Sequence, residues 1–186
     1  DAPTVASGVS FEPGINGQGG YFSSAQLYYP ALNNIDSQEG TIEFWIKPRW
    51  AGNDNTHHTI LRWGVGGGMI VIKDGANNLR LYLNRFVAEK NIGIQVGHWQ
   101  PNDWHHVVFS WSNSQKRLRG FIDGVEYPSD SISGEFPTIS DSQFQIGNGF
   151  ASEDVDAVLD ELKIRRIAFV PTAANLTGFN LGATIA

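Results

Sequence analysis

The stretch NDWHHVVFSW, residues 102–111, shows a strict alternation of side chains. One set of alternating positions is His105, Val107, Phe109 and Trp111, and the other is His106, Val108 and Ser110. A period of two is typical of a β-strand, in which successive side chains point to opposite faces of a sheet. His105 and His106 therefore point in opposite directions and cannot bind one metal ion together from a regular strand. The stretch predicts a strand rather than an active site.

Strand-like segments recur on both sides of this stretch. They are GTIEFWIKP (40–48), HTILRWG (58–64), GMIVIKDG (68–75), NLRLYLNRF (78–86), RLRGFIDGVEY (117–127), SQFQIGNG (142–149) and DAVLDELKIRRIAF (156–169). The Asp123-Gly124 pair predicts a tight hairpin turn. Leu159 and Leu162 have a helical spacing, but no capping box opens that segment, so we expect a strand there too. The pattern predicts an antiparallel β-sandwich of ten or more strands.

The composition restricts the class of protein. With 186 residues, 41% hydrophobic and 17% charged, the chain predicts one globular domain. The formal net charge of −6 argues against non-specific nucleic-acid binding and against an anionic membrane surface. The absence of cysteine excludes disulfides and thiolate zinc sites. No apolar run approaches the roughly 20 residues that a membrane span needs, and the opening DAPTVASG has no signal-peptide pattern.

Five motifs in register resemble one family. GTIEFWIKPRW, WHHVVFSW, LRGFIDGVE, FQIGNG and VLDELKI occur in the order and spacing of bacterial laminin-G-like, concanavalin A-like domains. The opening VSFEPGINGQGGYFSSAQLYYP resembles the first strands of that family, so the resemblance covers roughly residues 8–169. It implies an all-β fold, a two-sheet antiparallel jelly-roll sandwich with one concave face. We expect a laminin-G-like domain over residues 1–170 and a tail over 171–186 that is a linker or an extra edge strand.

The resemblance leaves the activity open, because domains of this fold include lectins, polysaccharide-binding modules, adhesin parts, hydrolases and lyases. Glucanase relatives carry Glu-x-Asp-x-x-Glu on one strand, and the nearest stretch here, EDVDAVLDE, lacks this pattern. Asp156 and Asp160 would lie about 13 Å apart along a regular strand, whereas retaining glycosidases need two carboxyl groups about 5–5.5 Å apart. The Arg, His and Tyr pattern of alginate-lyase-like relatives is not legible either. We therefore expect that the chain is not an enzyme.

Asp160 is the candidate metal ligand. In a regular strand it lies on the same face as Val158, Leu162 and Ile164, which predicts an inward-facing carboxylate that must be paired, hydrogen-bonded or bound to a cation. The resemblance implies that this aspartate either helps to hold a structural Ca²⁺ ion or ties down the N-terminal loop. Calcium would take oxygen ligands from Asp160 and loop carbonyls. In the alternative, the carboxylate accepts hydrogen bonds from backbone N–H groups. Both alternatives stay open.

The predicted ligand-binding residues are Trp50, Trp63, Trp99, Phe150 and Asp154. The four aromatic residues lie in or next to loops that contain Gly, Asn and Asp. A planar ring can stack on the apolar C–H face of a sugar while nearby polar groups bind the hydroxyls. The alternative is that these rings plug the ends of the sandwich. Asp154 belongs to an acidic loop that either binds Ca²⁺ near a ligand or is simply solvated.

Three hypotheses follow. The first, which we favour, is a secreted, non-catalytic carbohydrate-binding module of a larger extracellular or cell-surface protein. Its partners would be a glycan or polysaccharide and the other domains of the parent protein, with no nucleic acid and no membrane insertion. The second is a structural or adhesive spacer, or a protein-interaction domain, of a surface or phage protein. The third is a polysaccharide-active hydrolase or lyase with an unrecognised site.

Overall fold

The structure, a computed structural model, describes residues 3–64, 68–84, 89–127, 132–147, 153–169 and 171. These residues form fourteen strands. The first seven are β1 (Val5–Ser7), β2 (Ser10–Pro13), β3 (Gln18–Phe22), β4 (Gln26–Pro30), β5 (Glu39–Pro48), β6 (His58–Trp63) and β7 (Met69–Lys73). The others are β8 (Asn78–Leu83), β9 (Lys90–Gln95), β10 (His105–Ser112), β11 (Arg117–Ile122), β12 (Val125–Tyr127), β13 (Gln143–Gly147) and β14 (Ala157–Arg165).

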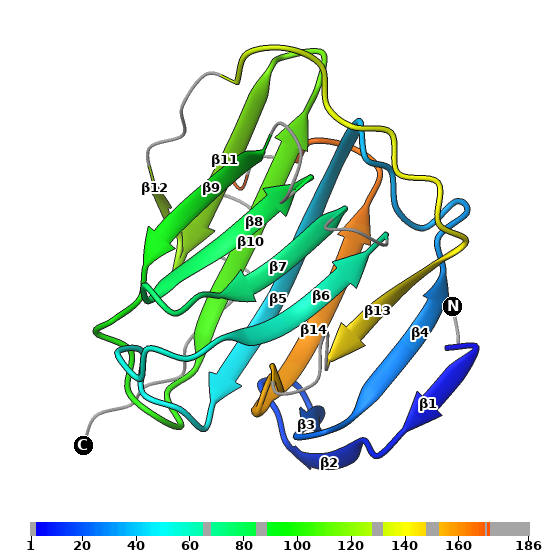
Figure 1. Cartoon of the computed structure of the whole chain (residues 1–186). Coiled ribbons are helices and arrows are strands. Elements are labelled where there is room, and N and C mark those ends of the chain that lie inside the picture. Colours follow the sequence, from blue (N-terminus) through cyan, green and yellow to red (C-terminus); the bar gives the residue numbers. More distant parts are fainter. Residues whose placement is uncertain are drawn as a thin grey trace.

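The strands form two seven-stranded antiparallel sheets that pack face to face (Figure 1). Sheet A has the order β1-β4-β13-β6-β7-β8-β9, and sheet B has the order β12-β11-β10-β5-β14-β3-β2. Several neighbours, such as β4 with β13 and β3 with β14, come from distant parts of the chain. The predicted two-sheet antiparallel sandwich is confirmed.

The alternating stretch becomes β10, a central strand of sheet B. It pairs with β5 so that Val107 lies opposite Phe44 and Phe109 lies opposite Ile42. These four side chains are fully buried and face sheet A, where they form part of a single large hydrophobic core. The period-two pattern of the sequence therefore indicates which face of β10 packs into the core.

The predicted hairpin turn joins β11 to β12. Asp123 and Gly124 have φ angles of 50° and 80°, the left-handed backbone that a type I′ turn requires at both central positions. The Asp123 carboxylate accepts the backbone N–H of His106 at 2.8 Å and lies 2.9 Å from Nδ1 of His105. Burial disfavours its charged form, but these hydrogen bonds outweigh that effect and keep the pKa of Asp123 below its usual range. The turn is thereby tied to the start of β10.

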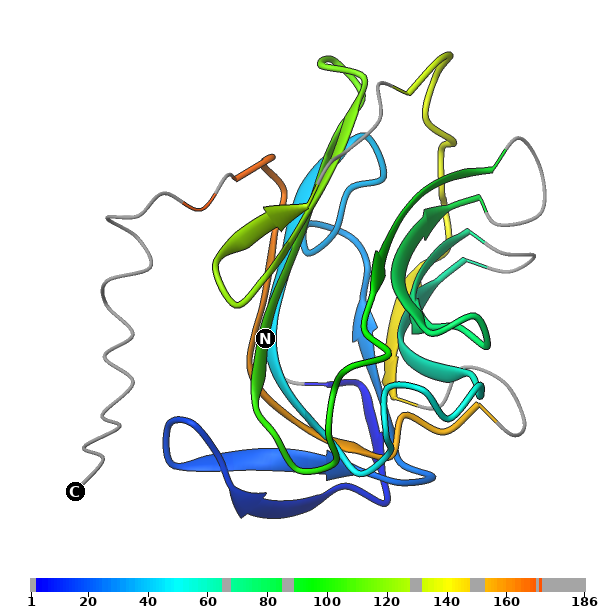
Figure 2. The same cartoon turned by 90° about the vertical axis from the view of Figure 1, so that its left-hand side faces the viewer.

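The two sheets bend in the same sense, so that the outer face of sheet A is concave (Figure 2). The segment from 156 is a strand, as expected, and its pairing with β5 is interrupted by a bulge between Asp160 and Lys163. Residues 172–186 of the predicted tail lie outside the described residues, and so does residue 170 at the end of the predicted domain. In the described part of the chain, no helix is long and apolar enough to cross a membrane.

Candidate functional site

Three of the predicted sugar-binding rings are buried. The exposed fractions of Trp50, Trp63 and Trp99 are 6%, 4% and 1%, and all three pack into the hydrophobic core. The indole N–H of Trp50 donates to the carbonyl of Val155 at 2.8 Å, and that of Trp63 donates to the carbonyl of Asp141 at 2.9 Å. These rings are therefore not exposed, which supports the alternative that they plug the ends of the sandwich, and a role of the three tryptophans in ligand binding stays a prediction.

Trp50 and Trp99 belong to a stack of four rings. Ring centroids are 4.6 Å apart between His58 and Trp50, 6.1 Å apart between Trp50 and Trp99, and 4.0 Å apart between Trp99 and His105. Each pair lies within 16° of parallel, so the contact is face to face. The four residues come from two separate parts of the chain, residues 50–58 and residues 99–105, so their stacking is a property of the tertiary fold.

Of the remaining two predicted ligand-binding residues, Asp154 contacts this stack through His58. Phe150 lies outside the described residues. Asp154 is half-buried; its carbonyl oxygen lies 2.8 Å from Nδ1 of His58, and its carboxylate accepts the hydroxyl of Ser24 at 3.5 Å. A role for Asp154 in binding a ligand or Ca²⁺ stays a prediction.

Asp160 fastens the N-terminal part of the chain to β14. Its Oδ2 accepts the backbone N–H groups of Ile15 and Asn16 at 2.8 and 3.0 Å, and its Oδ1 accepts the N–H of Glu161 at 2.8 Å. The approach is so close that a Cβ atom at Gly14 would collide with the carboxylate. Of the two alternatives that the sequence left open, this geometry supports the hydrogen-bonding role.

The predicted direction of Asp160 is wrong, and the bulge is the reason. Asp160 lies opposite Trp45, whereas Leu159 lies opposite Ile46, a residue of the core. Asp160 therefore points to the outer face of sheet B, where it is only 8% exposed. After the bulge the register shifts and Ile164 faces the core again, so a simple alternation along β14 fails. In the described residues, no three His, Cys, Asp or Glu side chains gather as a metal site would require.

Replacing Asp160 by alanine should lower the free energy of unfolding by about 3 kcal/mol, because buried N–H groups of the 15–16 loop lose a charged acceptor. Urea unfolding measures the loss. Asp154→Ala is the matched control and should cost less than about 0.5 kcal/mol, since Asp154 is a half-buried carboxylate with one long side-chain contact. Thermal unfolding tests calcium: we expect a chelator to leave the melting temperature unchanged. A fall that added Ca²⁺ reverses in the parent protein, but not in Asp160→Ala, would restore Asp160 as a metal ligand.

The concave face of sheet A carries a continuous row of aromatic, amide and guanidinium side chains. In register across β4, β13, β6, β7, β8 and β9, the row is Tyr28, Gln145, Arg62, Ile70, Tyr82 and Asn91. Adjacent strands are about 4.8 Å apart, so six strands span roughly 24 Å. Ile70, Tyr82 and Gln145 are buried, with exposed fractions of 0%, 9% and 9%, whereas Tyr28, Arg62 and Asn91 are half-buried. The face therefore combines flat apolar surface with hydrogen-bonding groups.

Hydrogen bonds orient the polar groups at the β4 and β13 end of the row. The amide of Gln145 donates to Oε1 of Gln26 at 2.9 Å, and the hydroxyl of Tyr28 donates to the same oxygen at 3.3 Å. Tyr28 and Gln145 thus share one acceptor on a neighbouring position of β4. Because this network fixes the side chains before a ligand arrives, little rotamer freedom would be lost on binding.

A second network lies at the β8 and β9 end of the row. The guanidinium of Arg80 donates to Asp74 at 2.5 Å and to Asn91 at 2.7 Å, and it lies 5.9 Å from the ring centroid of Tyr82. Burial disfavours the charged form of Asp74, but hydrogen bonds from the backbone of Asn78 and from Arg80 keep the pKa of Asp74 below its usual range. Asp74 and Arg80 therefore form an ionised pair, and the guanidinium of Arg80 lies over the ring of Tyr82.

Sequence reasoning missed this row, although part of its signal was present. The alternation in NLRLYLNRF places Arg80 and Tyr82 opposite the leucines that enter the core. That pattern shows that Arg80 and Tyr82 face outward, but it does not show that the outer face of their sheet is concave. Nor does it reveal that Tyr28 and Gln145 lie side by side, because β4 and β13 are far apart in the sequence.

Solved structures with similar folds include an arabinanase domain in complex with a sugar and the binding domains of botulinum neurotoxins. Domain 4 of AbnA, an extracellular GH43 arabinanase from Geobacillus stearothermophilus solved in complex with arabinotriose, matches with a TM-score of 0.71 and 20% identity. The match covers 92% of this chain and 80% of that one. The botulinum neurotoxin serotype D binding domain matches with a TM-score of 0.70 and 15% identity, over 93% of this chain and 45% of that one.

The binding domain of botulinum neurotoxin DC, solved in complex with rat synaptotagmin II, matches with a TM-score of 0.71 and 15% identity, over 91% of this chain and 44% of that one. This chain thus spans less than half the length of these toxin domains. At these identities the likeness shows the fold alone. No curated protein sequence matches the chain. One family model matches residues 18–173, most of the chain, and the protein therefore belongs to the concanavalin A-like lectin/glucanases superfamily.

Proposed function

We propose that this domain is a non-catalytic carbohydrate-binding module of a larger extracellular protein, and that it holds a glycan on the concave face of sheet A. The observation that carries the proposal is the row from Tyr28 to Asn91. The half-buried ring of Tyr28 offers flat apolar surface for the C–H face of a sugar, and the amide and guanidinium groups of Asn91 and Arg62 offer hydrogen-bonding partners for hydroxyls. A row that crosses six strands suits an extended chain of sugar units better than a single unit.

The relatives support this reading. The superfamily includes lectins and glucanases, so the fold alone leaves both binding and hydrolysis open. The arabinanase domain was solved with arabinotriose, and its parent enzyme is extracellular. By analogy with this arabinanase, we propose that the domain is extracellular and that it is one of several domains of its parent protein.

The carboxylates nearest to a glycosidase motif have structural partners, which supports a non-catalytic role. Asp156 accepts the hydroxyl of Tyr21 at 2.9 Å, and Asp160 accepts three backbone N–H groups. These contacts give both carboxylates a structural role, which supports binding without hydrolysis. Binding of a protein receptor, the second hypothesis, is represented by the toxin domain in complex with synaptotagmin II, and the experiment below separates the two.

The test is affinity electrophoresis and calorimetry against arabinan, arabinotriose and a panel of other soluble polysaccharides. Replacing Tyr28 by alanine should weaken binding of the responding glycan at least tenfold, because a stacking ring contributes about 1.4 kcal/mol or more. Tyr21→Ala is the matched control, since Tyr21 is also a half-buried tyrosine but faces outward from sheet B. Equal losses in both variants, or no binding across the panel by folded protein, would contradict the proposal and favour a protein-binding or spacer domain.

A further inference from the structure

The outer face of sheet B carries apolar side chains that do not belong to the core between the sheets. Trp45, Val108, Phe121 and Val158 alternate with core residues along β5, β10, β11 and β14, so they point away from sheet A. All four are buried, with exposed fractions between 0% and 6%. An antiparallel sheet that leaves one face to water has mostly polar side chains on that face. The outer face of sheet B therefore resembles the surface under a further layer.

The charged side chains in the middle of this face are paired with one another. Glu43 accepts a hydrogen bond from Arg165 at 2.6 Å, and it lies 3.3 Å from Nε2 of His106. The hydrogen bonds with His106 and Arg165 outweigh burial and lower the pKa of Glu43 to about 2, so the carboxylate is ionised at neutral pH. Because these charges already have partners, an uncharged segment can cover them without burying a lone charge.

The chain turns onto this face after β14. Thr41 occupies an outward position of β5 and is fully buried. Its hydroxyl donates to the carbonyl of Ile167 at 2.8 Å and accepts the backbone N–H of Phe169 at 2.8 Å. In Figure 2 the orange-to-red chain beyond β14 lies on the side of sheet B that faces away from sheet A. The chain up to Phe169 has therefore already reached the outer face.

The sequence of the C-terminal segment, residues 170–186, suits an apolar surface. Residues 167–186 contain no Asp, Glu, Lys, Arg or His. The apolar residues of the segment include Val170, Leu176, Phe179, Leu181 and Ile185. This composition is atypical of a solvated linker, which has low hydrophobicity and high net charge.

The C-terminal segment is also long enough to cross the face. Trp45 lies four positions beyond Thr41 on β5, about 14 Å away along a regular strand. Residues 170–186 span about 25 Å even as a helix, and more in an extended conformation. Covering the face from Thr41 to Trp45 therefore requires only part of the segment.

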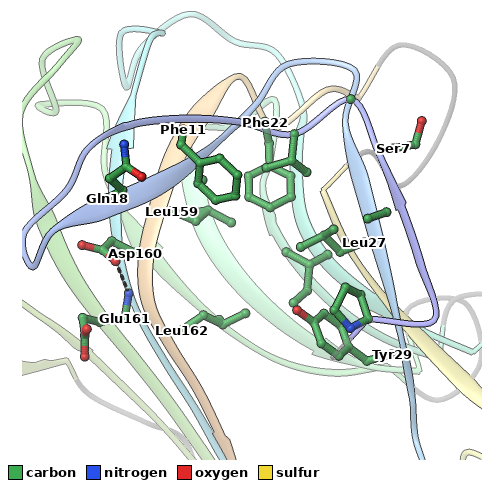
Figure 3. A pocket seen from close by; sticks show the side chains of 16 residues that line it. Ser7, Phe11, Gln18, Phe22, Leu27, Tyr29, Leu159, Asp160, Glu161 and Leu162 are labelled. Atoms are coloured by element: carbon green, nitrogen blue, oxygen red, sulfur yellow. Dashed lines mark hydrogen bonds between the residues drawn. The ribbon is translucent and has the colours of Figure 1, made fainter. Parts of the chain in front are cut away.

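A second apolar surface lies at the edge of the sandwich. A cavity of about 490 Å³ opens between β1 and β4 of sheet A and β2, β3 and β14 of sheet B, and its walls are mostly apolar (Figure 3). Phe11 at this cavity is 67% exposed, whereas Phe121 on the outer face of sheet B is 4% exposed. The burial of Phe121 and the exposure of Phe11 favour the outer face over the cavity as the covered surface.

We propose that the C-terminal segment packs across the outer face of sheet B and covers Trp45, Val108 and Phe121, instead of serving as a linker or extending a sheet. The domain then has three layers, with sheet B in the middle. The glycan row lies on the concave face of sheet A, on the opposite side of the molecule, so this inference does not depend on the proposed function.

The absence of cysteine from the chain provides a selective test. Val107→Cys and Val108→Cys are a matched pair on β10, because both valines are buried but only Val108 points to the outer face. Each is combined with Phe179→Ser in the full chain, and the rate at which a thiol reagent modifies the single cysteine is measured under native conditions. We expect Phe179→Ser to accelerate modification of Val108→Cys at least tenfold, because it removes a buried ring from the segment. Modification of Val107→Cys should not change.

Leu181→Ser replaces Phe179→Ser if the latter fails to fold, and circular dichroism verifies that each variant keeps its sheets. An unchanged rate at Val108→Cys would overturn the proposal, and so would equal acceleration at Val107→Cys. Leu27→Cys, at the cavity, tests the competing location. Acceleration at Leu27→Cys without acceleration at Val108→Cys would place the segment in the cavity and overturn the proposal. Glycan binding should persist in Phe179→Ser, so the two proposals can fail independently.

Discussion

Replacing Trp99 by alanine should lower the free energy of unfolding by about 3–5 kcal/mol, one of the two largest effects of a single change that we expect. Trp99 is 1% exposed and is stacked between Trp50 and His105, so its removal leaves a large cavity at the end of the core. The surrounding loops cannot collapse fully into that space, because hydrogen bonds hold them to the sandwich. Urea unfolding followed by circular dichroism measures the loss.

Trp99→Phe is the matched control. It keeps a ring in the stack, and it loses no hydrogen bond, because the indole N–H of Trp99 has no partner among the described residues. We expect it to cost clearly less than the alanine variant. If Trp99→Ala kept its stability and instead lost glycan binding, Trp99 would be an exposed binding residue and the burial described here would be wrong.

Replacing Asp54 by alanine is the second of the two changes. It should lower the free energy of unfolding by about 3–5 kcal/mol at neutral pH. Its partner, Lys73, has a side chain with no exposed surface, and the ammonium contacts the carboxylate of Asp54 and the carbonyl oxygen of Thr56. The ammonium also lies 5.7 Å from the ring centroid of Trp50. Without Asp54, a buried cation would remain with no anion, and burial strongly disfavours an unpaired charge.

A second variant separates the charge from the packing. Asp54→Ala combined with Lys73→Met removes both charges and keeps the volume of the long side chain, so it should be more stable than Asp54→Ala alone. Urea unfolding of the parent and both variants gives the comparison. A double variant that is no more stable than the single one would show that the loss comes from the other contacts of Asp54, those with Thr56 and His58.

The same pair predicts a dependence on pH. Burial disfavours the charged form of Asp54, but hydrogen bonds from Lys73, Thr56 and His58 outweigh it and hold the pKa of Asp54 well below its usual range. A carboxylate with a depressed pKa stabilises the fold above its unfolded pKa, near 3.9, and this contribution is lost as the pH falls towards the folded value. Unfolding free energy should therefore fall below about pH 4 in the parent protein, and less steeply in Asp54→Ala.

The sequence predicted the strands but not how the ends of the sandwich are closed. Alternation along β5 and β10 reports which side chains face the other sheet, because strand geometry alone determines it. The Asp123-Gly124 pair predicted the hairpin turn for an equally local reason. A type I′ turn needs left-handed backbone at both central residues, and an Asp-Gly pair adopts it readily. Trp50 and Trp99, in contrast, lie in loops. Whether the side chain of a loop residue is buried depends on which other parts of the chain pack against it. Here those parts include His58 and His105.

The candidate site was missed for a related reason. Tyr28, Gln145 and Arg62 are neighbours only because β13 inserts between β4 and β6, a pairing with no local signal in the sequence. The curvature that makes their face concave is a property of the whole sheet. Asp160 shows the opposite case: a buried carboxylate, either hydrogen-bonded or bound to Ca²⁺, was expected, and the bulge is why its predicted inward direction is wrong.

The most direct test of the account is to map where a bound glycan lies, by backbone amide chemical shifts of the labelled protein during titration with arabinotriose or the best ligand from the polysaccharide panel. We predict that the largest changes fall on outward-facing residues of β4, β6, β8, β9 and β13, with Tyr28, Arg62 and Tyr82 among them. Changes concentrated on the outer face of sheet B or at the cavity beside Phe11, with sheet A unaffected, would contradict the assignment of the concave face as the glycan site.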